Sequence, residues 1–146
     1  MKRLKGSKSP RLPKQRSLRS GTLYLPAILF ASLLGTYLDL YFVEKNFYAF
    51  PLRPFPEVFS INIVFTLIVL PLLTWIFLYL VDKMSRLSRL IFILFLSALV
   101  PFFEKKSIEL GYLYQADQWD PLYSFIGYFL FFVLIWKVFR WGKGDR

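Results

Sequence analysis

The chain has 146 residues, of which 56% are hydrophobic and 21% aromatic, and its formal net charge is +10. This apolar fraction exceeds what a soluble domain of this size can hide from water, so the composition predicts an integral membrane protein. The chain has no cysteine and no histidine, which excludes disulfides, thiolate zinc sites, cysteine nucleophiles and the commonest general base. We therefore expect no metal site and no cofactor, and any chemistry must use carboxylates, hydroxyls, Lys or Arg.

Residues 1–20 form a basic segment with eight Lys or Arg residues and no acidic residue. Ser, Pro, Gly and scattered Leu make up most of the rest, a composition that cannot bury a core and predicts a disordered tail. Its charge either only fixes the orientation of the chain in the membrane or also binds anionic lipid headgroups. Nucleic acid is not an expected partner, because no aromatic or folded module accompanies the charge.

The first apolar run covers residues 23–43. At about 1.5 Å per residue it is long enough to cross the roughly 30 Å hydrocarbon layer as a helix. A cleaved signal peptide is the alternative, but the run is long for such a segment and no small-residue cleavage site follows it. Ser32, Gly35, Thr36 and Asp39 recur along the run at helical spacing. This small and polar stripe predicts close packing against another helix.

The second apolar run covers residues 58–81 and follows a segment, residues 44–57, that contains three prolines. The prolines exclude a continuous helix there and predict an extended, aromatic-rich loop at the membrane interface. Pro71 lies near the middle of the second run, where it predicts a kink. We expect a neighbouring helix to satisfy the carbonyl that Pro71 leaves free. Asn62, Thr66 and Thr74 lie at helical spacing and are expected to face the other helices.

The third run, residues 87–104, is only just long enough to span a membrane. Its helix either stops near Pro101 or tilts and continues through Glu104 toward Gly111, a residue suited to end a helix. The two alternatives place Glu104 differently. It lies at the membrane edge in one and within a helix in the other.

The fourth predicted span covers residues 121–140, with Asp120 as a suitable N-cap and Pro121 in the first turn. Trp136 and Trp141 lie near its far end among basic residues, a pattern typical of an interfacial belt. The predicted fold class is thus all-α and integral to the membrane. A four-helix transmembrane bundle with short loops, residues 21–146, follows the tail.

The number of basic residues alternates between high and low from one segment outside the predicted spans to the next. The tail, the second loop and the C-terminal segment hold fifteen of the 19 Lys and Arg residues, and the first and third loops hold four. The positive-inside rule therefore predicts a multi-pass protein with both termini in the cytoplasm. Seven of the nine acidic residues fall on the opposite side or at its membrane edge. This outer end is where we expect any functional site.

The candidate site collects polar and aromatic residues from all four spans and their outer loops. A carboxylate within hydrocarbon costs about 2.5 to 3.5 kcal/mol, so the acids should face the bundle and find partners. The candidates for a ligand or partner site are Asp39, Arg53, Asn62, Glu104, Trp119, Tyr123 and Ser124. The acids form either a structural polar clamp, with Arg53, Asn62 or Tyr123 as partners, or a ligand or ion site. The aromatic residues are either interfacial anchors or a ligand cage.

A family resemblance is carried by two stretches, GTYLDLYFVEKNFYAFPLRPFPEVFS at 35–60 and FEKKSIELGYLYQADQWDPLYSF at 103–125. They resemble a family of short multi-span proteins from spore-forming Gram-positive bacteria. In that family a Glu at a helix end is followed by a Gly, a Trp and an aromatic-Ser pair that opens the last helix. The corresponding residues here are Glu104, Gly111, Trp119, Tyr123 and Ser124. The resemblance implies a bacterial cell or spore membrane and implies no activity.

Three classes of function follow from these observations. The first is a non-enzymatic membrane component, an assembly partner or structural element whose outer polar and aromatic end contacts a membrane protein partner, a second copy of the chain or a ligand. The second is a small transporter or channel subunit, since intramembrane acids mark ion paths. The third is a membrane-embedded enzyme acting on a lipid through the carboxylates of Asp39, Glu44 or Glu104. We prefer the first class and assign no catalytic residue, because the sequence contains no enzyme motif.

Overall fold

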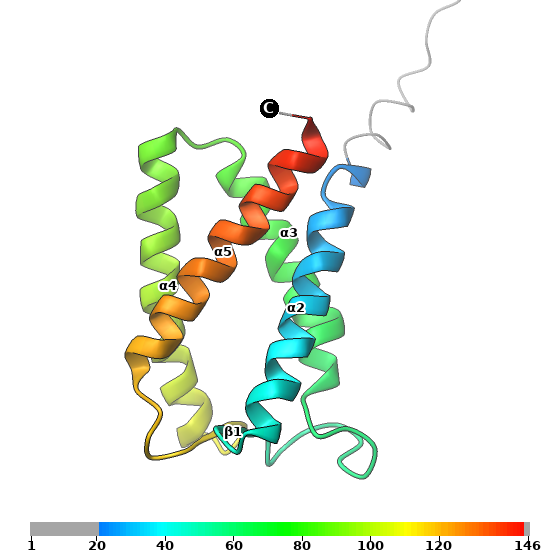
Figure 1. Ribbon diagram of the computed structural model, residues 1–146, viewed down its shortest axis with the longest axis vertical. Coiled ribbons are helices and arrows are strands. Elements are labelled where there is room, and N and C mark those ends of the chain that lie inside the picture. Colours follow the sequence, from blue (N-terminus) through cyan, green and yellow to red (C-terminus); the bar gives the residue numbers. More distant parts are fainter. Residues whose placement is uncertain (1–20, 145–146) are drawn as a thin grey trace, which may run out of the picture.

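The computed structural model describes residues 21–144, so the basic tail predicted at residues 1–20 lies outside the described part. The helices run up and down side by side (Figure 1). They are α2 (Leu25–Glu44), the π-helical segment η1 (Phe65–Val69) continued by α3 (Leu70–Val81), α4 (Arg86–Glu109) and α5 (Pro121–Lys143). Helix α5 packs against both α2 and α4, and α3 packs against α2. The fold is therefore mostly helical, as the sequence predicts.

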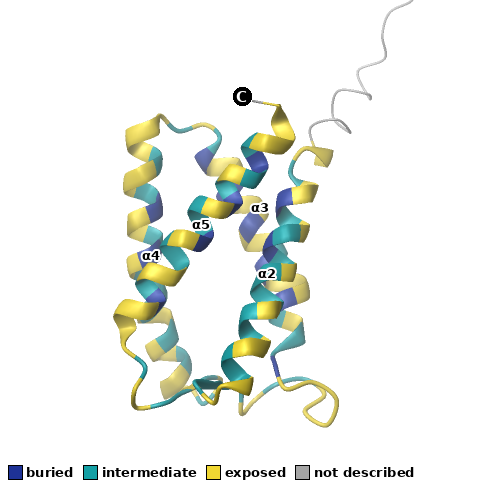
Figure 2. Ribbon diagram, in the orientation of Figure 1, coloured by how far each residue is buried: buried dark blue, intermediate teal, exposed yellow. Residues whose placement is uncertain are grey.

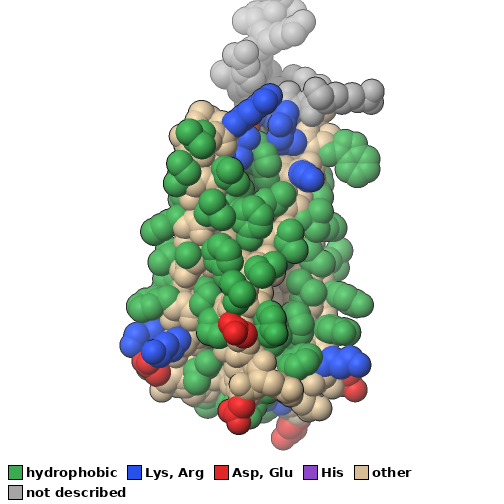
Figure 3. Space-filling view, turned by 60° about the vertical axis from the view of Figure 1, so that its left-hand side comes forward, with side chains coloured by type: hydrophobic (Ala, Val, Ile, Leu, Met, Phe, Trp, Pro, Cys, Tyr) green, Lys and Arg blue, Asp and Glu red, His purple; other side chains and the backbone are tan. Residues whose placement is uncertain are grey.

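Within residues 21–144, three helices are long and apolar enough to cross a membrane, namely α2, α4 and α5. The segments η1 and α3 together form a shorter apolar helix, Phe65–Val81. Large hydrophobic side chains on these helices are exposed, such as Leu33 at 73% exposure. Exposed residues run along the helices in Figure 2, and Figure 3 shows a mainly hydrophobic face with charged side chains near its two ends. Such a surface suits lipid rather than water, which supports a multi-pass membrane protein.

The second helix is shorter than expected, since the predicted span at 58–81 begins with loop. Arg53 explains part of the difference, because its guanidinium donates to the carbonyls of Phe59 at 2.6 Å, Phe50 at 2.8 Å and Pro56 at 3.2 Å. These bonds hold the proline-rich segment in a non-helical loop. Asn62 Oδ1 then accepts a hydrogen bond from the backbone N–H of Phe65 at 3.2 Å, as a capping side chain does at a helix start.

Helix α4 is longer than the predicted span of 87–104, because it continues to Glu109. Of the two alternatives, the one that runs toward Gly111 is confirmed. Gly111 has a φ of 79°, and its N–H donates to Ile108 O at 3.0 Å while that of Tyr112 donates to Ser107 O at 2.9 Å. This is a Schellman motif, which needs a residue that tolerates positive φ. Glu104 therefore lies inside α4, just before the last turn of the helix.

A π-helical segment, η1, lies just before Pro71, where the sequence predicts a kink. Leu70 N–H bonds to Phe65 O, five residues back. In the same pattern, with each N–H bonded to the carbonyl five residues back, Pro71 would donate to Thr66 O, but proline has no N–H. Ser32 Oγ on α2 donates to Thr66 O instead, at 2.7 Å. The prediction that a neighbouring helix satisfies the carbonyl freed by Pro71 is confirmed.

The start of α5 also follows the sequence prediction. Asp120 Oδ1 accepts a hydrogen bond from Leu122 N–H at 2.8 Å, and Pro121 is the first helical residue. Helix α5 extends to Lys143, three residues beyond the predicted end at 140. Its C-cap is Gly144, with a φ of 77°.

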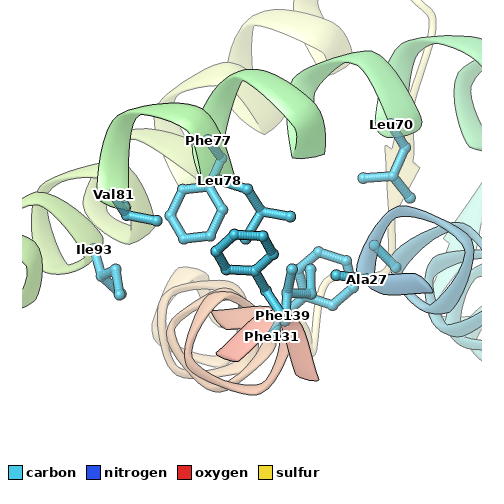
Figure 4. Packing of buried hydrophobic residues seen from close by; sticks show 10 residues of the cluster. Ala27, Leu70, Phe77, Leu78, Val81, Ile93, Phe131 and Phe139 are labelled. Carbon is cyan, nitrogen blue, oxygen red and sulfur yellow. The ribbon is translucent and has the colours of Figure 1, made fainter. Parts of the chain in front are cut away.

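The hydrophobic core lies mainly in the half of the bundle near the two chain ends, and Figure 4 shows part of it. Leu78 of α3 and Ile135 and Phe139 of α5 are almost completely buried. On α2 the residues facing them are small, since Ala27 and Ala31 are fully buried. Small residues let helices approach closely in lipid, where van der Waals packing drives association. This half of the bundle is therefore well packed.

Candidate functional site

A two-stranded ribbon joins the first and third connecting loops at one end of the bundle, which we call the loop end (Figure 1). Strand β1 (Tyr48–Ala49) pairs antiparallel with β2 (Tyr114–Gln115), with Tyr48 opposite Gln115 and Ala49 opposite Tyr114. The pairing places side chains from both loops over the ends of the helices. Two of these side chains contact an acidic residue of α4.

Glu104 is the acceptor at the centre of this contact. Its Oε2 accepts hydrogen bonds from Ser124 Oγ of α5 at 2.5 Å and from Gln115 Nε2 of β2 at 3.0 Å. Its Oε1 accepts a longer bond from the Tyr48 hydroxyl of β1, at 3.4 Å. Ser124, which is 2% exposed, in turn accepts from Trp119 Nε1 at 3.0 Å. We call these five residues the Glu104 network.

The donors that reach Glu104 are all neutral. The ion pairs found within residues 21–144 join Lys106 to Glu109 at 2.7 Å and Lys143 to Asp82 at 2.9 Å, and neither includes Glu104. Burial raises the pKa of the Tyr48 phenol, and the nearby Glu104 charge raises it further. Tyr48 therefore stays a neutral hydrogen-bond donor at physiological pH. The network holds its carboxylate without supplying a positive charge.

Aromatic rings surround the indole of Trp119. The ring centroids of Tyr48, Phe42, Phe47 and Tyr123 lie 4.7, 5.1, 5.7 and 5.7 Å from that of Trp119, with tilted or edge-on orientations. Such orientations are favourable for aromatic pairs. The cluster takes rings from α2, the first loop and α5, so Trp119 closes the loop end between α2 and α5.

A cavity of about 290 Å³ lies between α2 and α5, directly next to this cluster. Leucine and phenylalanine side chains of the two helices form most of its wall, together with Phe65 and Leu70. Its polar lining consists of Asp39, Tyr48, Trp119, Tyr123, Ser124 and Tyr128. The cavity thus joins an apolar space between two membrane-length helices to the Glu104 network.

Asp39 projects from α2 into the lining of this cavity. Among residues 21–144 its carboxylate takes part in no hydrogen bond and no ion pair. A carboxylate without a partner on a membrane-length helix is unfavourable in lipid, and no contact within residues 21–144 accounts for the position of Asp39.

The structure brings together five of the seven predicted site residues. Trp119 and Ser124 bond to each other, Ser124 bonds to Glu104, and Tyr123 and Asp39 line the cavity beside them. Arg53 and Asn62, two of the three alternative partners considered for the acids, form their hydrogen bonds elsewhere. Asn62 caps the start of the second helix and Arg53 binds loop carbonyls, so neither pairs with Asp39 or Glu104.

Three further residues of the site were not singled out from the sequence. Tyr48 and Gln115 reach Glu104 only because β1 and β2 pair, and strands of two residues leave no periodic signal. Gly127 lines the cavity on α5, and a Cβ placed there meets no atom within 4 Å. A lone glycine in an apolar run can indicate such a space, but glycine is equally common where two helices pack closely in lipid.

The arrangement can accept hydrogen bonds and recognise positive charge, and it can enclose an apolar chain. No group of three acidic residues that could hold a metal ion is found among residues 21–144. The chain matches no family model, no curated protein and no solved structure.

Proposed function

We propose that the protein is a non-enzymatic multi-pass membrane protein whose loop end binds an amphipathic ligand in the cavity between α2 and α5. The observation that carries this proposal is the cavity itself, which combines an apolar wall with a few convergent polar groups. Ligand sites in proteins have this composition. The apolar wall suits a hydrocarbon chain, and Asp39 and the Glu104 network suit a polar head group.

The same cavity argues against a channel through a single chain. Its wall uses α2 from Leu34 to Phe42 and α5 from Tyr123 to Leu134. The other half of the bundle is filled by the core around Leu78. A catalytic function has less support as well, because the chain offers neither His nor Cys to pair with the carboxylates.

For the topology we propose four membrane crossings with both termini in the cytoplasm, in a bacterial cell or spore membrane as the family resemblance implies. The 15 to 4 distribution of basic residues supports this orientation, and the loop end then faces outward. The Phe65–Val81 helix has 17 residues. It covers about 25 Å, so local bilayer thinning has to make up a few ångströms.

Reporter fusions test the topology. Fusions after residues 50, 85, 115 and 146 should report outside, inside, outside and inside in turn. An outside location for the C-terminal fusion contradicts the proposed topology.

Native mass spectrometry of protein extracted with a mild detergent tests the binding function. Wild type should retain a bound amphipath, whereas Gly127→Leu should lose it, because the new side chain extends into the cavity. Gly142→Leu is the matched control, since Gly142 lies on the same helix, also has no atom within 4 Å of an added Cβ and does not line the cavity. Equal retention by both variants contradicts a ligand in this cavity. A stoichiometric protein in place of a lipid would show an assembly partner instead.

A further inference from the structure

We propose that the cavity selects a membrane lipid with a cationic head group, an ammonium that lies against Asp39 while the hydrocarbon chain follows the gap between α2 and α5. This inference rests on the proposed binding function and adds the charge of the ligand. Three features of the described residues support it: an unpaired acid, a lining without basic residues and an aromatic wall.

The unpaired acid is Asp39. Its carboxylate lines the cavity without a hydrogen bond or ion pair among residues 21–144. Glu104 shows what a satisfied acid looks like in the same region, because it accepts from three side chains. An ammonium head group would supply to Asp39 the charge that the fold does not provide, and a primary or secondary ammonium would also supply N–H donors.

Among residues 21–144 no Lys or Arg lines the cavity, and three of the basic residues near the loop end have contacts elsewhere. Arg53 binds backbone carbonyls of its own loop, and Lys106 pairs with Glu109. The Lys45 ammonium lies 5.9 Å from the ring centroid of Tyr41. Among residues 21–144 the formal charge in the cavity wall therefore comes from Asp39, and an anionic or phosphate head group would be repelled.

The aromatic wall adds a second source of attraction for a cation. Phe42, Tyr48, Trp119 and Tyr123 all line the cavity. Ring faces attract ammonium groups, and the attraction increases when the cation is removed from water. A carboxylate together with several rings is a chemical environment that suits primary, secondary and quaternary ammonium groups.

The size and opening of the cavity favour a lipid over a soluble amine. Its volume of about 290 Å³ is near the lower limit of the roughly 300 to 1,000 Å³ typical of ligand pockets. It therefore accommodates a head group with part of one chain. Leu130 and Leu134 line the cavity and are 59% and 41% exposed, so it opens on the lipid-facing surface.

The experiment uses the full chain in neutral maltoside micelles and four amphipaths of equal chain length: dodecylammonium, dodecyltrimethylammonium, dodecanol and dodecanoate. Relative binding is measured by native mass spectrometry with competition. Wild type should prefer each cation over dodecanol by about tenfold, as expected for one charge-assisted contact, and should bind dodecanoate least.

Asp39→Asn should reduce this preference to near unity, and Asp39→Glu should keep most of it. Glu57→Gln is the matched control, because Glu57 is an exposed acid that does not line the cavity. It should leave the preference unchanged. These substitutions should fold, since no bond within the described chain depends on either side chain.

The possible failures are distinguishable. If dodecanol binds as well as the cations and Gly127→Leu abolishes binding of both, the charge inference is wrong and the binding function stands. If no amphipath binds, or if Gly127→Leu changes nothing, the binding function itself is wrong.

Discussion

The two halves of the bundle use the same helices in different ways. In the half near the chain ends, Ala27 and Ala31 on α2 are fully buried and Leu78, Ile135 and Phe139 pack beside them. We call this the packed half. In the half near the loops, the cavity separates α2 from α5 and Asp39 has no partner within the described chain. We call this the cavity half. In a membrane the packed half supplies rigidity, and the cavity half can be filled by lipid at little cost.

Small residues on α2 account for part of the difference. Gly35 lies where α2 meets the second helix, and the Leu70 side chain occupies the space that a Cβ would need. Gly35 also lines the cavity, and one turn further on Asp39 and Phe42 continue its wall. The ribbon and the Trp119 cluster then hold the loop end in place around the cavity. Specific contacts therefore border the loop end of the cavity.

The largest loss of stability is expected at Glu104, because several side chains of the cavity half share its carboxylate as their hydrogen-bond acceptor. Glu104→Leu should lower the free energy of unfolding by about 3 kcal/mol, because it leaves the buried Ser124 hydroxyl and the Gln115 amide without their acceptor. Glu104→Gln should cost less, since an amide oxygen can still accept. Unfolding in mixed micelles with SDS measures both. A change below about 0.5 kcal/mol, the size typical of surface substitutions, would show that the network is not structural.

In the packed half, Leu78→Ala should lower the free energy of unfolding by about 2 kcal/mol. The loss is below that of a soluble core, because lipid also solvates leucine and mainly the cavity term remains. The same titration measures it, with Leu33→Ala on the exposed face of α2 as the control. Equal effects at positions 78 and 33 would contradict the distinction between packed and lipid-facing sites.

At the junction of the two halves, Ser32→Ala should cost about 1 kcal/mol, because the Thr66 carbonyl loses its donor. Pro71→Ala restores a backbone N–H and should make the Ser32 contact less important. A double-mutant cycle therefore should show coupling of about 0.5 kcal/mol or more. Additive effects would indicate that Ser32 and Pro71 do not share this carbonyl.

The smallest effects come from two glycines and should differ in sign. Gly35→Ala should destabilise by about 1 kcal/mol because Leu70 must move. Gly127→Ala should be neutral or stabilising by about 0.5 kcal/mol, since its Cβ enters open space and alanine favours a helix. Thermal unfolding of the two variants in one detergent gives the comparison. Destabilisation at both positions would mean that the cavity half is as closely packed around Gly127 as α2 is around Gly35.

Local chemistry made much of the fold predictable from the sequence. Asp120 and Pro121 start α5, and Gly111 ends α4. A neighbouring helix donates to the carbonyl that Pro71 leaves free. Each of these three features depends on a few residues with fixed hydrogen-bonding capacity. The start of the second helix was not predictable in this way. Val58 and Phe59 are apolar but belong to a loop held by a single arginine, so hydrophobicity alone extended the helix too far.

The candidate site was predictable in its residues more than in its contacts. The sequence offered Asn62 as one possible partner of the acids, but a sequence pattern does not fix how a helix is rotated in the bundle, and Asn62 caps its own helix. The partners of Glu104 come from the ribbon and from α5. They depend on loop pairing between segments far apart in the chain, for which one sequence gives no signal.

The most direct test of the cavity as a ligand site is photo-crosslinking in a bilayer with an alkylamine that carries a diazirine in its chain. Adducts that excess unlabelled dodecylammonium displaces should map to the cavity-lining parts of α2 and α5, residues 34–42 and 123–134. Gly127→Leu should abolish these displaceable adducts and Gly142→Leu should not. Displaceable adducts spread evenly over lipid-facing positions such as Leu29 and Leu33, and unchanged in Gly127→Leu, would contradict a ligand site between α2 and α5.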